Sequence, residues 1–190
     1  MITIVPYDPA WLEEFATIAR ELRSALGPDA LRIDHIGSTA VPGLSAKDIV
    51  DIQVTVAALE PFDRQAAALA GAGFETRPEL WTDHLPPGVT GPASDWQKRM
   101  VKPGPHGRAA NIHVRVAGRP NQRYALLFRD FLRAHPRSAT AYAELKRRLA
   151  LHLGEIRDYA EVKDPACDLI IEAAEAWAAH TNWSPGASDA

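Results

Sequence analysis

The stretch from residue 35 to residue 54 (HIGSTAVPGLSAKDIVDIQV) constrains the fold of this chain more than any other. Residues 49–56 alternate between apolar and polar side chains, which is typical of a β-strand with two different faces. Asp51 and Gln53 lie on the polar face of that strand. The apolar face is made of Val50, Ile52, Val54 and Val56. Such a face must be covered, so the pattern predicts a sheet packed against helices.

A turn of small residues precedes this strand. Gly37, Ser38 and Thr39 follow a short predicted strand, residues 31–36. A glycine lets backbone N–H groups approach a phosphate, and the two hydroxyls add further donors. A carboxylate such as Asp51, held on a rigid strand beside the turn, suits Mg²⁺ bridged to a nucleotide. The spacing fits an ordinary turn equally well, with Asp51 capping a neighbour or facing solvent.

These residues resemble the nucleotidyltransferase signature, in which Gly-Ser or Gly-Gly is followed by two carboxylates alternating on a strand. They are more similar to the GrpB-like family pattern HIGSTAVPGLAAKPIIDI, from which Ser45, Asp48 and Val50 are the only departures up to Ile52. The family motifs also found here are NIHV at 111–114, FRDFLR at 128–133, YAELK at 142–146 and YAEVK at 159–163. The resemblance covers nearly the whole chain, which is therefore identified as a member of the family.

The resemblance implies a polymerase-β-like nucleotidyltransferase fold of the α+β class, with a mixed sheet covered by helices. It extends to the accessory domain that follows dephospho-CoA kinase in some actinobacterial proteins. The chain contains no Walker A sequence, so we expect no kinase half within it.

The rest of the pattern predicts one domain over residues 1–181 and a disordered tail over 182–190. Residues 78–95, rich in proline and glycine, read as a long surface loop with scope for functional movement. Helices are expected at 8–26 and 61–70, strands at 74–77, 96–101 and 111–116, and a helical last third from Arg119, whose final helix follows Asp164-Pro165.

Composition narrows the functional classes. A net charge of −3 over 190 residues gives no electrostatic argument for bulk nucleic-acid or membrane binding. No stretch approaches the length of a membrane span. Cys167 is the only cysteine, which excludes an intrachain disulfide and a cysteine-based zinc site. We therefore expect a cytoplasmic domain.

The candidate metal ligands depart from the nucleotidyltransferase pattern. Two-metal chemistry requires two or three carboxylates, but Gln53 stands at the second position and His113 near the third. Together with His35, the pair Asp51 and His113 would suit Zn²⁺, Mn²⁺ or Ni²⁺ better than Mg²⁺. Structural roles stay open, with His113 hydrogen-bonded within the sheet and His35 orienting the glycine turn.

Basic residues form a second constellation. Lys47 lies between the turn and Asp51, and aromatic neighbours in the family motifs are expected to turn further cations toward a common cleft. These cations are Arg129, Lys146 and Lys163. Such a cluster suits a triphosphate or polyphosphate. The alternative is that these residues are solvated helix charges that form surface ion pairs.

Three hypotheses follow from these residues. The first is a nucleotidyltransferase that binds a nucleotide with Mg²⁺ or Mn²⁺, with Asp51 as the catalytic residue. The second is a nucleotide- or anion-binding module with degenerate chemistry that assists a partner protein. The third is a metal-dependent enzyme that uses the histidines, with Zn²⁺ as one candidate. Gln53 favours the second hypothesis, and the retained turn predicts a phosphate-bearing ligand under the first two.

Overall fold

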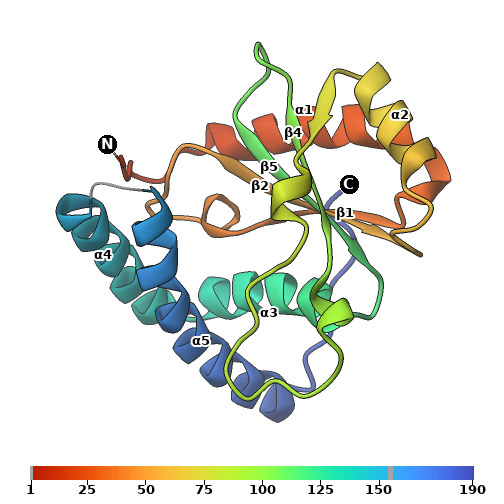
Figure 1. Cartoon of the computed structure of the whole chain (residues 1–190). Helices are drawn as coiled ribbons and strands as arrows, with labels where there is room; N and C mark the ends of the chain where they lie inside the picture. Colours follow the sequence, from red (N-terminus) through yellow and green to blue (C-terminus); the bar gives the residue numbers. More distant parts are fainter. Residues whose placement is uncertain (1, 154–155) are drawn as a thin grey trace.

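A five-stranded mixed sheet forms the centre of the molecule (Figure 1). The computed structural model describes residues 2–153 and 156–190. The strands lie in the order β1-β2-β5-β4-β3, and β2 pairs with β5 in parallel while the other neighbours are antiparallel. Their bounds are β1 Arg32–Ile36, β2 Val50–Val56, β3 Phe74–Thr76, β4 Arg99–Pro103 and β5 Ala110–Val116.

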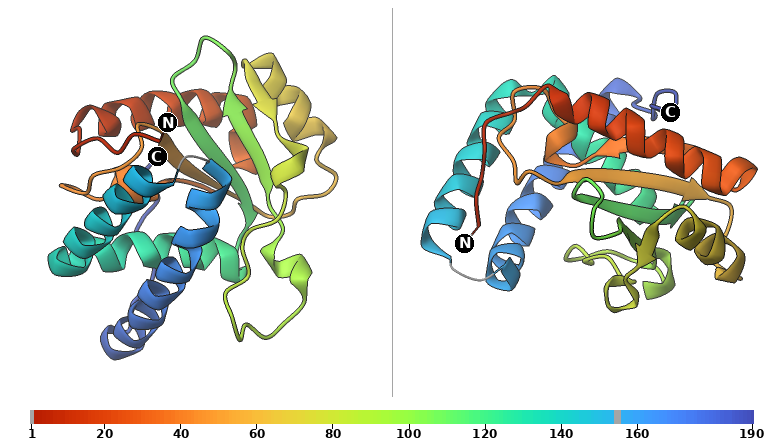
Figure 2. Two further views of the ribbon diagram at one scale, coloured as in Figure 1. Left: turned by 60° about the vertical axis from the view of Figure 1, so that its left-hand side comes forward. Right: turned by 90° about the horizontal axis from the view of Figure 1, so that it is seen from above.

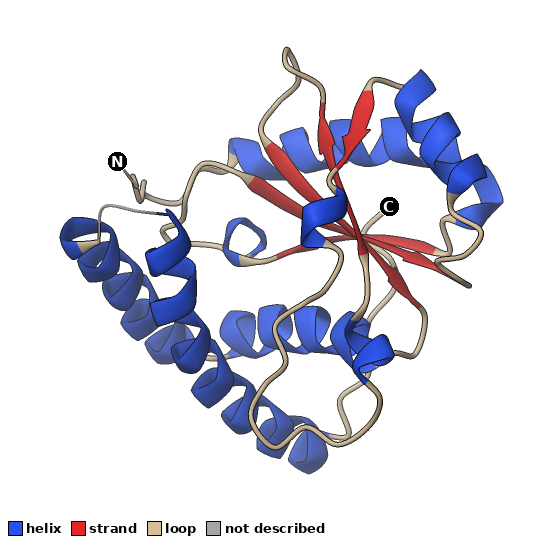
Figure 3. Cartoon of the chain, viewed as in Figure 1, coloured by secondary structure: helices blue, strands red, loops and turns tan. Residues whose placement is uncertain are grey.

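Helices pack on both sides of this sheet (Figures 2 and 3). The first two, α1 Ala10–Leu26 and α2 Asp63–Gly71, cover one face. The other three are α3 Pro120–Ala134, α4 Pro136–His152 and α5 Ile156–Thr181. The α+β class with a mixed sheet, helical cover and a helical last third is confirmed. Within the described part of the chain, no helix combines the length and apolar character needed to span a bilayer.

Apolar and polar side chains alternate along β2 and lie on opposite faces of the sheet, as predicted. Its apolar residues are fully buried against α1 and α2 in the larger hydrophobic core. A second core joins α3, α4 and α5 with the loop residues Val41 and Leu44. The opposite face of β2, which carries Asp51 and Gln53, is thereby left between the sheet and the three C-terminal helices.

The start of the last helix was predicted wrongly. Helix α5 begins at Ile156 and continues through Pro165. Proline removes one intrahelical hydrogen bond, but Pro165 is exposed, and the buried side of the helix runs on past it through Tyr159, Cys167 and Ile171. Packing of this apolar side outweighs the local preference of proline for a helix start.

The tail is ordered against β1, which corrects the expected disorder of residues 182–190. Strand β1 is an edge strand, and the tail bonds its otherwise unpaired backbone groups. Ile33 N donates to Ser188 Oγ (2.9 Å), and Ala190 N donates to Ile33 O (3.1 Å). Asp189 Oδ2 accepts from His35 N (2.9 Å) and from Arg129 Nη1 (2.7 Å). The tail therefore reinforces the strand that leads into the glycine turn.

We expect Asp189→Ala to lower the free energy of unfolding by about 1–3 kcal/mol, because it leaves the buried Arg129 guanidinium without one of its charged partners. The matched control is Glu175→Ala, which removes an acid paired with the more exposed Arg123 and should cost less than about 1 kcal/mol. Urea denaturation measures both values. If both variants lose the same free energy of unfolding, the tail contact stabilises the protein no more than a surface ion pair does.

Candidate functional site

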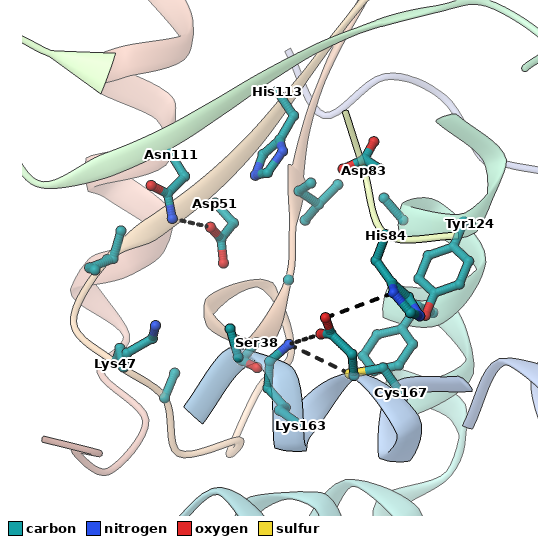
Figure 4. Close-up of a pocket in the computed structure, with 18 of the residues that line it drawn as sticks. Ser38, Lys47, Asp51, Asp83, His84, Asn111, His113, Tyr124, Lys163 and Cys167 are labelled. Carbon is teal, nitrogen blue, oxygen red and sulfur yellow. Dashed lines mark hydrogen bonds and ion pairs between the residues drawn. The ribbon is translucent and has the colours of Figure 1, made fainter. Parts of the chain in front are cut away.

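A pocket of about 390 Å³ lies between the polar face of the sheet and the C-terminal helices (Figure 4). The glycine turn and Asp51 lie on its sheet side, while α3, α4 and α5 supply the facing wall. The sequence-predicted residues that line it are Gly37, Ser38, Thr39, Lys47, Asp51, His113, Lys146 and Lys163. Most of the candidate ligand-binding residues are therefore gathered into one cavity.

The glycine turn lies directly against Asp51. Residues Ile36 and Asp51 are partners in the β1–β2 register, so the turn begins beside the carboxylate. Gly37 has φ +68°, and a Cβ atom at this position would lie 2.5 Å from Asp51 Oδ2. Both the left-handed backbone and the close contact require glycine. This contact holds the turn and the strand carboxylate together at one end of the pocket.

One carboxylate oxygen of Asp51 accepts a hydrogen bond within the protein. Asn111, its partner in the parallel β2–β5 register, donates from Nδ2 to Asp51 Oδ1 at 2.9 Å. Burial raises the pKa of Asp51, whereas the bond from Asn111 and the charges of nearby lysines lower it. The net result is a raised pKa. The other oxygen, Oδ2, faces the turn and accepts no hydrogen bond from the residues that the structure describes.

Three lysines from separate parts of the chain reach this end of the pocket. Lys146 of α4 is buried, and its Nζ donates to Ser38 Oγ (2.7 Å) and to Ser45 O (2.5 Å). Lys47 lies over the Tyr159 ring, 5.1 Å from its centroid. Lys163 of α5 lines the same pocket, with Nζ 3.7 Å from Asp164 Oδ1 and 3.6 Å from Cys167 Sγ (Figure 4). The three ammonium groups share this part of the pocket with the carboxylate of Asp51, and Lys163 also lies beside that of Asp164.

Burial lowers the pKa of two of these lysines. For Lys47 desolvation is the largest cause, partly offset by Asp51 and reinforced by Lys163. For Lys146 desolvation and the charge of Lys163 lower the pKa to about 7. An anion placed among these groups would stabilise their charged forms.

Gln53 is held by protein groups and does not face the pocket as a ligand. Its Oε1 accepts from Arg115 Nη1 (2.7 Å), and its Nε2 donates to Gln122 O (3.1 Å). Arg115 in turn binds Asp83 from Nε (2.8 Å). The position of the second carboxylate in the nucleotidyltransferase signature is thus occupied by an amide that orients an arginine.

His113 is fixed as a neutral imidazole. Its Nδ1 lies 3.3 Å from both Lys98 Nζ and Arg115 Nη2. Both of these groups only donate, so Nδ1 accepts and the proton is assigned to Nε2. Burial, followed by the charges of Arg115 and Lys98, lowers the pKa of His113 well below its usual value. His113 is therefore a hydrogen-bond donor beside the pocket, not a ready metal ligand.

His35 lies outside the pocket, so the proposed metal set is not brought together. Its ring stacks on Phe15, with centroids 4.8 Å apart, and its Nε2 pairs with Thr39 Oγ1 at 2.9 Å. Burial and the charges of Arg133 and Arg129 lower its pKa to about 3. Over residues 2–153 and 156–190, no group of three His, Cys, Asp or Glu side chains is arranged to hold a metal ion. The donor set does not fit a transition metal or a two-metal centre.

Arg129 also lies outside the pocket, unlike the position expected for a phosphate-binding residue. Its Nη1 donates to His35 O (3.0 Å) and Asp189, and its Nε donates to Asp130 Oδ1 (2.7 Å). The buried guanidinium joins α3 to the end of β1 and to the tail. It supports the turn from outside the pocket, and of the four predicted cations Lys47, Lys146 and Lys163 line the pocket.

Sequence reasoning missed the part of the pocket that the long loop supplies. Asp83 lies in that loop, but it is anchored by Arg115 and by Lys98, whose Nζ lies 2.6 Å from Asp83 Oδ1. Burial raises the pKa of Asp83, but these two cations outweigh it and hold the pKa well below the usual range. The next residue, His84, reaches α5, where its Nε2 lies 3.0 Å from Asp168 Oδ2. An isolated Asp-His pair in a proline-rich loop carried no spacing that could have revealed these contacts.

Comparison with known proteins identifies the family. The family described as GrpB protein matches residues 1–173. A crystal structure of the conserved protein GrpB from Enterococcus faecalis superposes with a TM-score of 0.75 at 32% identity, covering 92% of this chain and 99% of that one. The chain therefore belongs to the GrpB family. It has the α+β fold, with a mixed sheet covered by helices, that its sequence predicted.

Two curated relatives place the chain in different protein contexts. UPF0157 protein PA4798 of Pseudomonas aeruginosa is 37% identical, with 94% of this chain and 70% of that protein covered. A protein named dephospho-CoA kinase from Mycolicibacterium paratuberculosis is 36% identical, covering 97% of this chain and 48% of the relative. The chain thus spans about half the length of this second relative.

We expect Gly37→Ala to destabilise the protein more than Gly43→Ala. Both glycines have positive φ, but a Cβ at position 43 meets nothing within 4 Å. The control should cost about 1–2 kcal/mol from backbone strain, and Gly37→Ala about 1–3 kcal/mol more from the contact with Asp51. Chemical denaturation measures the difference. Equal costs would mean that the turn and Asp51 are not in firm contact.

The buried neutral histidines predict destabilisation in mild acid. His35 and His113 have pKa values below the usual 6.5, so below pH 6.5 the unfolded chain binds protons that the folded protein does not. Between pH 6.5 and 5 the free energy of unfolding should fall by up to about 2.7 kcal/mol per pH unit, which corresponds to two protons. Urea denaturation across this range gives the slope.

Two histidine variants test the origin of this slope. His113→Gln should reduce it by about one proton, whereas His180→Gln, at an exposed position of α5, should leave it unchanged. A slope in His113→Gln equal to that of the wild type would contradict the assignment.

Proposed function

We propose that this protein binds a phosphate-bearing small molecule, a nucleotide or a polyphosphate, in the pocket between its sheet and C-terminal helices. The observation that carries the proposal is the convergence of Lys47, Lys146 and Lys163 around the Gly37-Ser38 turn, where these lysines outnumber the carboxylates of Asp51 and Asp164. Lysine ammonium groups bind phosphate as point charges. The backbone and hydroxyls of a glycine turn add directional donors.

Local charge supports an anionic ligand. The lowered pKa values of Lys47 and Lys146 indicate that their charged forms are poorly stabilised by the protein alone. A polyphosphate would supply the missing negative charge and make binding and lysine protonation mutually favourable. His113 would add its Nε2–H as a neutral donor, which can bind an oxygen of the ligand without altering the charge.

A divalent ion belongs to this proposal only as a companion of the ligand. Mg²⁺ is commonly held by one or two carboxylates together with the phosphates of a substrate. Asp51 would offer one carboxylate, through Oδ2. Two-metal transfer would need a second acidic ligand, and Gln53 is committed to Arg115 and Gln122 instead. We therefore favour ligand binding over nucleotidyl transfer, which remains the alternative for the same pocket.

The protein context of the relatives suggests how such a module could act. In proteins named dephospho-CoA kinase, the part matching this chain is about half of the whole. A binding module that serves a partner protein agrees with that arrangement and with the incomplete carboxylate set. Turnover of a nucleoside triphosphate by the purified chain, lost in Asp51→Asn, would instead support the transferase.

We expect tripolyphosphate and nucleoside triphosphates to raise the melting temperature, and Mg²⁺ to modify the shift. A ligand at about 100 times its dissociation constant adds about 2.7 kcal/mol to the free energy of unfolding. Lys47→Ala and Lys163→Ala should each weaken binding by about tenfold or more, because each removes a charge from the pocket.

The control for this experiment is Lys102→Ala. Lys102 is a half-buried residue of β4 that pairs with Glu75 and does not line the pocket, so its removal should leave affinity unchanged. The proposal fails if wild-type protein gives no shift with any of these anions, or if the control weakens binding as much as the pocket variants do.

A further inference from the structure

Ser38 and Lys146 contact each other in the arrangement of a nucleophile and its base. Lys146 Nζ lies 2.7 Å from Ser38 Oγ and 2.5 Å from the backbone oxygen of Ser45. We propose that Ser38 is a nucleophile that accepts an acyl group from an acyl phosphate, with Lys146 as its general base. This inference rests on the phosphate-binding pocket proposed above, to which it adds a substrate class and a reaction.

The hydrogen bond to Ser45 orients Lys146 toward Ser38. The Ser45 carbonyl oxygen can only accept, so it holds one N–H of Lys146 whatever the charge of the lysine. In the neutral amine, the lone pair of Nζ is then available to the hydroxyl hydrogen of Ser38. A nucleophile within hydrogen-bond distance of a base, and a base oriented by a third group, together form the arrangement that activates serine in covalent catalysis.

The surroundings of Lys146 make its neutral form accessible. Burial is the main cause that lowers its pKa to about 7, and the side chain also lies over the Tyr142 ring, 4.7 Å from the centroid. A lysine with the usual pKa of about 10.4 would be almost wholly protonated at pH 7. Four further charged or titratable groups act on Lys146: Lys163 and Lys47 lower its pKa, while Asp51 and Cys167 raise it.

An acyl phosphate has a group for each part of the pocket: a phosphate for the lysines and an acyl carbon for the activated serine. Lys47 and Lys163 offer charges for the phosphate, and Ser38 lies at the same end of the cavity for the acyl carbon. Phosphate is also a good leaving group when it takes up one proton and departs as hydrogen phosphate. It leaves as an anion, which the two lysines would stabilise as its charge develops.

The reaction is balanced in two steps. In the first, a bond forms between Ser38 Oγ and the acyl carbon, the bond between that carbon and the phosphate oxygen breaks, and phosphate leaves with the electron pair. The Ser38 proton passes to Lys146 and from it to the departing phosphate, which leaves as hydrogen phosphate, so that Lys146 is neutral again for the second step. In the second, water attacks the acyl-serine, the ester bond to Oγ breaks, and the carboxylic acid is released. Ser38 regains a proton through Lys146.

A fluorophosphonate probe, which forms a stable adduct with an activated serine, tests the nucleophile directly. We expect mass spectrometry of peptides to find the adduct on Ser38. Its rate of formation should rise about tenfold per pH unit up to about pH 7 and then level off, as Lys146 loses its proton. Acetyl phosphate should slow labelling, and wild-type protein should release phosphate from it faster than Ser38→Ala does.

Lys146→Arg separates charge from base function, because arginine keeps the positive charge but cannot be deprotonated. It should lower the labelling rate by about 10²- to 10⁴-fold, while Lys102→Arg, at a residue that does not line the pocket, should label like the wild type. Circular dichroism and a cooperative melt check that each variant folds. Lys146→Met replaces Lys146→Arg where the arginine variant does not fold.

Two results would overturn the inference while leaving the proposed function intact. One is a wild-type protein whose melting temperature rises with tripolyphosphate but which forms no adduct at Ser38. The other is labelling that persists, with an unchanged pH profile, in the folded Lys146 variants. Absence of the tripolyphosphate shift itself would overturn the anion site and this inference together.

Discussion

The pocket depends on the absence of a side chain at position 37. Because Gly37 lies against Asp51 Oδ2, the end of β1 and the carboxylate on β2 occupy one small volume. Ser38 follows immediately, and Lys146 reaches it from α4. The contact between a backbone turn and a strand carboxylate thus sets the position of the hydroxyl, and the hydroxyl meets the lysine. Arg129 and the tail brace the same turn from outside the pocket, through His35 O and His35 N.

The polar face of the sheet has two regions that differ in how their charges are paired. Around Asp83, the cations Lys98 and Arg115 are paired within the protein, and His113 and Gln53 complete their hydrogen bonds. Around Asp51, the lysines outnumber the acids. Since buried charges are stable when paired, the first region needs no ligand, whereas the second gains from one. This difference is the reason that we place the proposed ligand at the lysine end of the pocket.

Much of this arrangement was readable in the sequence. The alternation along residues 50–56 predicted both the buried face and the polar face, and the family motif predicted the fold together with the turn, Lys47 and Asp51 as neighbours. Lys146 and Lys163 also reach the pocket as the motifs suggested. These predictions succeeded because local spacing and strand pairing determine them.

Predictions that depended on tertiary partners were less successful. Arg129 occurs in a family motif, yet its charge is used by Asp130, Asp189 and a carbonyl oxygen, and no sequence spacing shows that the tail returns to β1. The ordering of residues 182–190 has the same cause, because an edge strand accepts a partner from anywhere in the chain. The role of Asp83 could not be predicted for a similar reason, since it comes from Arg115 on β5 and from Lys98 just before β4.

Lys146 connects the two activities that we assign to the pocket, and it makes them compete. An anion beside the lysine favours the ammonium form, which holds phosphate but cannot accept the Ser38 proton. A departing phosphate removes that charge and favours the neutral amine, which can activate water for the second step. Binding and chemistry thus require opposite protonation states of one residue. A lysine whose pKa is near 7 can pass between them at neutral pH, and a solvated lysine of ordinary pKa cannot. The burial of Lys146 beneath Ser38 and Ser45 is therefore the structural feature that would allow a phosphate site to act as a catalytic one.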